Sequence, residues 1–166
     1  MKEDISDAQE VLRKMRKCFQ KRPTGESGLV FDMKHLARQI EGSDFPVDGL
    51  NISGFYKYYP FLYVSDAWLF YLFATITYKF IECCIDSDFS FLNEDLISDY
   101  LQVSENEEKI RLIVKSCDKL QRRILGDALM SFMNIVQFDS NIHKPADIRR
   151  RLIFSADLWN DVVADF

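Results

Sequence analysis

An uncharged apolar run in the middle of the chain constrains the fold more than any other feature. From Ala67 to Tyr78 the sequence has no charged residue, and its most polar groups are two threonine and two tyrosine hydroxyls. As a helix, these twelve residues span about 18 Å, well short of the ~30 Å hydrocarbon core of a bilayer. We therefore expect no transmembrane segment. We expect Ser65–Ile85 to form the buried central helix of a soluble helical domain, with Ser65 as its N-cap.

The composition indicates one folded domain. The chain has 166 residues, of which 48% are hydrophobic and 14% aromatic; this is enough for one core and too apolar for a disordered chain. We therefore expect a single domain over residues 1–166. The formal net charge of −5 and the pI near 5.1 disfavour nucleic acid as the main partner, because phosphate binding depends on an excess of Lys and Arg.

Charge is unevenly distributed along the sequence. Residues 1–40 carry 9 basic and 6 acidic side chains, residues 41–105 carry 2 and 11, and the remainder carries 10 and 9. The resulting local charges of +3, −9 and +1 predict surface patches that suit a charged protein partner.

Residues that usually carry catalysis or bind metals are few and scattered. Cys18, Cys83, Cys84 and Cys117 form no CxxC pair and no Cys/His cluster, so we expect free thiols in a reducing, cytoplasmic environment and no metal. The sequence also lacks a glycine-rich phosphate loop, a nucleophile elbow and an HExxH pair. We therefore expect no cofactor and no enzymatic activity.

Helical periodicity covers much of the chain on both sides of the apolar run. Apolar residues three and four apart predict a first helix from Asp7 to Lys21, capped by Ser6 or Asp7, and a short helix from Asp32 to Ile40. Beyond the central helix, four more are predicted: Asn93–Val103, a segment after the polar sequence SENEE, Leu120–Phe138, and a last helix from Ala146 onward. The prediction is an all-α bundle of seven or eight helices.

Residues near the C-terminus resemble a known family. Val136, Ser140, His143, Lys144 and Phe154 fall at spacings similar to those of the RhoGAP domain, a helical module that accelerates GTP hydrolysis by Rho-type GTPases. The likeness extends over most of the chain. It implies a RhoGAP-like helical fold.

The resemblance also implies that the catalytic residue of the family is missing. The first family helix leads into an E-G-I-F-R motif whose Arg is the catalytic finger, and the same spacing here gives SGLVF, which ends at Phe31. Arg38 is the nearest arginine that could replace it. Lys79 aligns with a conserved family Lys, and His143 aligns with an Asn that contacts the GTPase.

The sequence-based hypothesis is a catalytically inactive RhoGAP-like interaction module, which holds a Rho-family small GTPase or another protein without promoting hydrolysis. The candidate contact residues are Phe31, Arg38, Lys79, His143 and Lys144. Three alternatives stay open: a helical interaction domain unrelated to GTPases, a divergent active GAP that uses Arg38, and a winged-helix-like nucleic-acid module fused to a bundle. The acidic pI disfavours the last of these.

Overall fold

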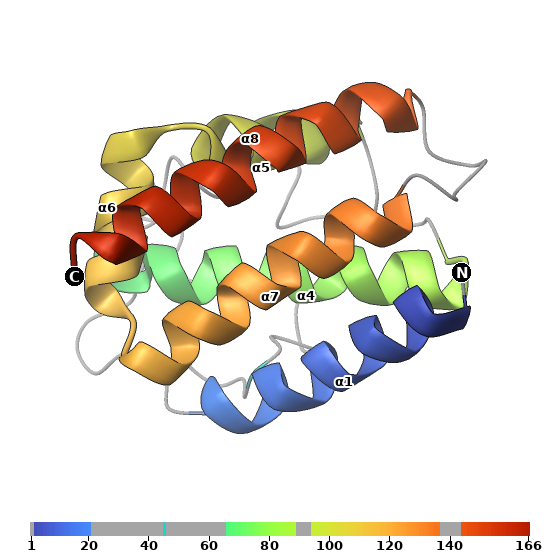
Figure 1. Cartoon of the computed structure of the whole chain (residues 1–166), viewed down its shortest axis with the longest axis horizontal. Helices are drawn as coiled ribbons and strands as arrows, with labels where there is room; N and C mark the ends of the chain where they lie inside the picture. Colours follow the sequence, from blue (N-terminus) through green and yellow to red (C-terminus); the bar gives the residue numbers. More distant parts are fainter. Residues whose placement is uncertain (1, 21–44, 46–65, 89–93, 137–143) are drawn as a thin grey trace, which may run out of the picture.

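The computed structural model describes residues 2–20, 45, 66–88, 94–136 and 144–166. These residues form helices and no strand, which confirms the all-α prediction for this part of the chain (Figure 1). The helices are α1 (Lys2–Cys18), α4 (Asp66–Asp86), α5 (Glu94–Ser104), α6 (Glu107–Ser116), α7 (Lys119–Val136) and α8 (Pro145–Ala164). The predicted helix from Asp32 to Ile40 and the predicted cap at Ser65 lie outside the described residues.

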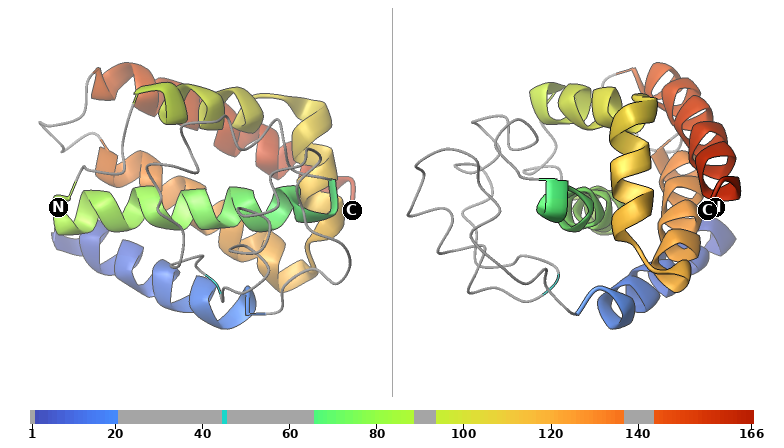
Figure 2. Two further views of the ribbon diagram at one scale, coloured as in Figure 1. Left: turned by 180° about the vertical axis from the view of Figure 1, so that it is seen from behind. Right: turned by 90° about the vertical axis from the view of Figure 1, so that its left-hand side faces the viewer.

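The uncharged run forms the buried helix that the sequence predicts. Every side chain of α4 from Leu69 to Ile81 is buried, because α1, α6 and α7 all pack against this helix. Figure 2 (right) shows α4 on the inner side of an arc made by the other helices. No helix in the described part of the chain is long and apolar enough to cross a membrane.

Stacked aromatic rings connect α4 to its neighbours. Phe73 of α4 stacks on Tyr100 of α5 with ring centroids 5.0 Å apart, and on Trp159 of α8 at 6.4 Å. The hydroxyl of Tyr100 shares a 2.7 Å hydrogen bond with Thr77, whose hydroxyl also donates to the carbonyl of Phe73 at 2.8 Å. These buried polar groups are therefore satisfied where three helices meet.

The first helix begins earlier than the sequence pattern predicts. α1 starts at Lys2, so Ser6 and Asp7 lie inside the helix and the prediction that one of them caps it is wrong. Two acidic residues in its first turn, Glu3 and Asp4, favour the earlier start because they complement the helix dipole. The predicted apolar stripe is buried as expected, through Ala8, Val11, Leu12 and Met15.

The later helix boundaries follow local capping signals. Asn106, within the polar sequence SENEE, is the N-cap of α6, and its side chain accepts a 3.0 Å hydrogen bond from the amide of Lys109. α8 begins at Pro145, directly after Lys144, whose backbone is left-handed with φ 52°. A proline in the first turn loses no helical hydrogen bond, which explains why the helix begins there.

Candidate protein-binding surface

A groove of about 880 Å³ lies between α7 and α8. Its base is formed by the buried indole of Trp159 on α8 and by Gly126 on α7, where a Cβ atom would lie 3.1 Å from Nε1 of Trp159. The same Nε1 donates a 3.1 Å hydrogen bond to the carbonyl of Arg122. The glycine therefore allows α7 and α8 to approach closely while the indole stays hydrogen-bonded.

Three large apolar side chains remain exposed along this groove. Leu120 and Met130 of α7 are 49% and 43% exposed, and Phe166, just beyond α8, is 55% exposed. Arg122 contacts Phe166, since its guanidinium lies 5.1 Å from the ring centroid, and its Nε donates to the carbonyl of Val114 at 2.8 Å. Exposed apolar side chains gathered on one surface are typical of a protein-binding site.

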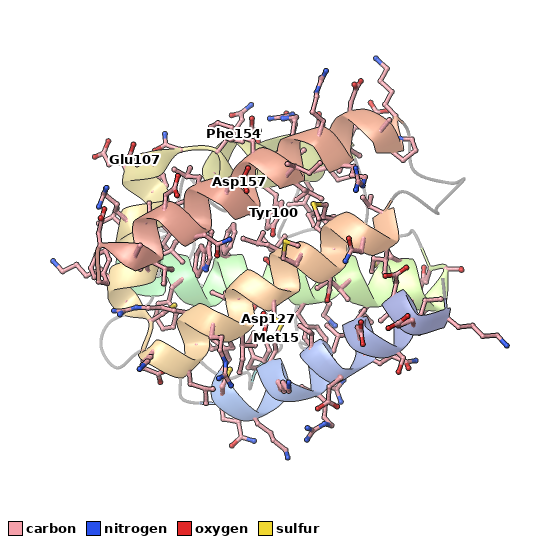
Figure 3. The ribbon with its side chains drawn as sticks, in the orientation of Figure 1. Met15, Tyr100, Glu107, Asp127, Phe154 and Asp157 are labelled. Atoms are coloured by element: carbon pink, nitrogen blue, oxygen red, sulfur yellow. The ribbon has the colours of Figure 1, made fainter. Side chains whose placement is uncertain are left out.

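Charged side chains flank these apolar groups. Lys119 and Arg123 are exposed near the start of α7, and Asp127 is exposed about midway along it (Figure 3). Neither Arg123 nor Asp127 forms an ion pair with another described residue. Both charges are therefore available to a partner as far as the described residues show.

The other side of α7 is acidic. A smaller hollow of about 310 Å³ between α1 and α7 is lined by Asp4, Asp7 and Glu10 of α1 and by Asp127 of α7. α1 and α7 run in opposite directions, so the acidic beginning of α1 lies beside the end of α7 (Figure 1). A hydrogen bond from Arg13 lowers the pKa of Glu10, which keeps this carboxylate ionised.

The candidate residues from the sequence do not come together on this surface. Lys79 of α4 has a side chain that is 11% exposed, and its Nζ lies 3.3 Å from Glu82. Glu82 also lies 4.0 Å from Arg16 of α1, which places this charge cluster where α1 meets α4. Lys144 is exposed at the start of α8. Phe31, Arg38 and His143 lie outside the described residues.

The groove residues are not apparent from the sequence pattern. Arg123, Asp127 and Met130 occupy the solvent side of an amphipathic helix, where the pattern predicts a face without a partner. Leu120 and Met130 are the apolar residues on that face, but the sequence alone does not distinguish them from residues of the buried stripe.

The four cysteines are free thiols. Burial raises the pKa of Cys83 and of Cys117 to about 12, and burial together with nearby Asp118 raises the pKa of Cys18 to about 11. Since the thiolate is the nucleophile and metal ligand, these three groups are protonated and inert near neutral pH. Within the described ranges no group of three or more His, Cys, Asp or Glu side chains could hold a metal ion.

These raised pKa values predict a loss of stability at alkaline pH. Above about pH 8.5 the unfolded chain releases thiol protons that the folded chain keeps, so unfolding becomes more favourable as the pH rises. We expect the free energy of unfolding to fall by roughly 1 kcal/mol per pH unit for each buried thiol. Urea titrations under reducing conditions at about pH 8 and about pH 10 measure this fall in the free energy of unfolding. If Cys117→Ala shows the same fall as the native chain, the buried Cys117 thiol does not contribute to it.

No protein-family model, no curated protein and no solved structure matches this chain.

Proposed function

We propose that this chain is a helical protein-interaction module that works by binding and not by catalysis. The observation that supports the proposal is the α7–α8 groove, where exposed Leu120, Met130 and Phe166 lie beside exposed Lys119 and Arg123. Methionine, arginine and aromatic side chains are enriched at protein interfaces, and this combination is uncommon on a purely solvated face. The protonated thiols further disfavour nucleophilic catalysis by Cys18, Cys83 or Cys117.

The RhoGAP resemblance suggests one class of partner. A RhoGAP-like module with Phe31 in place of the catalytic arginine would hold a Rho-family small GTPase without promoting hydrolysis. The contacts proposed for it are Lys79 and Lys144 together with Phe31, Arg38 and His143. Lys79 already pairs with Glu82 at 3.3 Å, so a GTPase carboxylate at this position would have to compete with that ion pair.

A binding assay with a matched control tests this partner class. The immobilised full chain is incubated with Rho- and Rac-type GTPases loaded with GDP or a GTP analogue, and retained GTPase is quantified. We expect that Lys144→Glu reduces retention at least about tenfold, because it replaces an exposed attraction by a repulsion, and that Lys79→Gln reduces it by a smaller factor, because it removes the charge without placing a second carboxylate beside Glu82. Lys109→Glu, on the exposed face of α6, changes the net charge equally and should have no effect.

This assay does not test the α7–α8 groove, because neither Lys79 nor Lys144 lines it. If no GTPase is retained in either nucleotide state, the proposed partner class is wrong. An equal loss of retention in Lys109→Glu would show a non-specific charge effect instead of a contact at Lys79 or Lys144.

A further inference from the structure

We infer that the α7–α8 groove binds a second copy of this chain, with the α7 helices of the two copies antiparallel around a two-fold axis. The inference rests on the proposed function, because it treats the groove as a protein-binding surface, and it names the occupant. Four exposed residues of α7 carry the argument: Leu120, Arg123, Asp127 and Met130.

These four residues form one stripe with a symmetrical order. At about 100° per residue they fall within an arc of about 80° on the helix surface. Along the helix they read apolar, basic, acidic, apolar. The spacing is the same from both ends, since Leu120 and Arg123 are as far apart as Asp127 and Met130. The midpoint lies at the level of the buried Leu125.

A two-fold axis at this midpoint makes the stripe complementary to itself. In an antiparallel pair of α7 helices, Leu120 of one copy lies opposite Met130 of the other, and Arg123 lies opposite Asp127. Two-fold symmetry repeats each contact, so the interface gains two apolar contacts and two ion pairs from one stripe. A different protein would need apolar, acidic and basic residues in the matching order, whereas a second copy of this chain has them by symmetry.

The surroundings of the stripe fit the same arrangement. Phe166 lies beside the start of α7, where Arg122 contacts its ring, so it is available to the sulfur of Met130 from the second copy. Lys119 at that end would approach the beginning of α1 in the second copy, where Asp7 lines the acidic hollow. The arrangement therefore also uses Phe166 and Lys119, which flank the stripe.

Overall charge does not oppose this association. Each chain has a net charge of −5, but residues 106–166, which include α7 and α8, carry 10 basic and 9 acidic side chains. The acidic excess belongs to residues 41–105. At physiological ionic strength, exposed charges more than about 8 Å apart are largely screened. The repulsion between two chains at this surface is therefore weak.

Charge reversal tests the pairing directly, with sedimentation equilibrium of the full chain as the measurement. We expect a monomer–dimer equilibrium for the native sequence. Arg123→Asp and Asp127→Arg alone should each weaken the dimer by about tenfold or more, because each turns both symmetric attractions into repulsions. The double variant Arg123→Asp/Asp127→Arg should restore the dimer. Both residues are exposed, and thermal unfolding confirms that the variants remain folded.

An equimolar mixture of the two single variants gives the sharpest result. Each variant alone should be largely monomeric, yet the mixture should form a heterodimer, because both cross-pairs are then Asp opposite Arg. Lys109→Asp on α6 is the control for charge and should dimerise as the native chain does. A native chain that stays monomeric, or a mixture that stays monomeric, overturns the inference.

The outcomes separate this inference from the proposed function. A chain that stays monomeric but retains a GTPase overturns self-association alone. A chain that dimerises through the stripe but retains no GTPase overturns the partner class alone. A dimer that Arg123→Asp leaves unchanged uses another surface, which also contradicts the inference.

Discussion

Phe73→Ala should lower the free energy of unfolding by about 3–5 kcal/mol, the range for removing a large aromatic side chain from a packed core. The phenyl ring is fully buried and stacks on both Tyr100 and Trp159. Its loss leaves a cavity where α4, α5 and α8 meet, and the surrounding rings can fill it only in part. Urea unfolding followed by circular dichroism measures the change. An equal dependence of the free energy of unfolding on urea concentration in the native chain and the variant confirms that the two can be compared as two-state transitions.

Phe154→Ala is the matched control for this prediction. Phe154 is 55% exposed and lies on α8 away from α7 (Figure 3), so the same chemical change should alter stability by no more than about 0.5 kcal/mol. Equal effects of the two substitutions would contradict the assignment of the core around α4. Phe154 is also one of the residues on which the RhoGAP resemblance rests, so the control measures how much its side chain contributes to the free energy of unfolding.

GTP hydrolysis by Rho- and Rac-type GTPases should not be stimulated by this chain, even at saturating concentration. An arginine finger supplies positive charge to the transferring phosphoryl group and accelerates hydrolysis by about 10³–10⁵-fold. This corresponds to about 4–7 kcal/mol of activation free energy, which the neutral Phe31 cannot supply. Single-turnover phosphate release with and without the chain is the measurement.

Two variants distinguish a divergent active GAP from a module that binds a GTPase without catalysis. Stimulation of about a hundredfold or more that disappears in Arg38→Ala would contradict the prediction and identify a divergent active GAP. Without such stimulation, a gain of activity in Phe31→Arg would show that a GTPase docks in the orientation that the RhoGAP resemblance implies.

The spacing of apolar residues was sufficient to predict the fully buried helix and the amphipathic helices, which bury one face. The uncharged run predicted α4 because few arrangements other than a buried helix accommodate such a sequence. Clear stripes predicted α7 and α8, with starts at Lys119 and Pro145 in place of Leu120 and Ala146. The start of α1 was missed because Ser6 and Asp7 are good caps in isolation, whereas the acidic first turn and packing favour a longer helix.

The groove could not be predicted in the same way. Its existence depends on how closely α7 and α8 approach at Gly126 and Trp159, and this distance is a property of tertiary packing. Leu120 and Met130 look like ordinary members of an amphipathic helix until their exposure is known. The complementarity of Arg123 and Asp127 becomes meaningful once both are placed on the same exposed stripe.

Hydroxyl-radical footprinting of the native chain tests most directly whether the α7–α8 groove is a protein-binding surface for a second copy. Oxidation of Met130 and Phe166 should fall as the concentration of the chain rises, and should stay high in the Arg123→Asp variant. Phe154 is an internal reference, since it has the same exposure of 55% as Phe166 and lies outside the proposed interface. Equal oxidation of Met130 and Phe166 at low and high concentration, with no difference between the native chain and Arg123→Asp, would contradict the account.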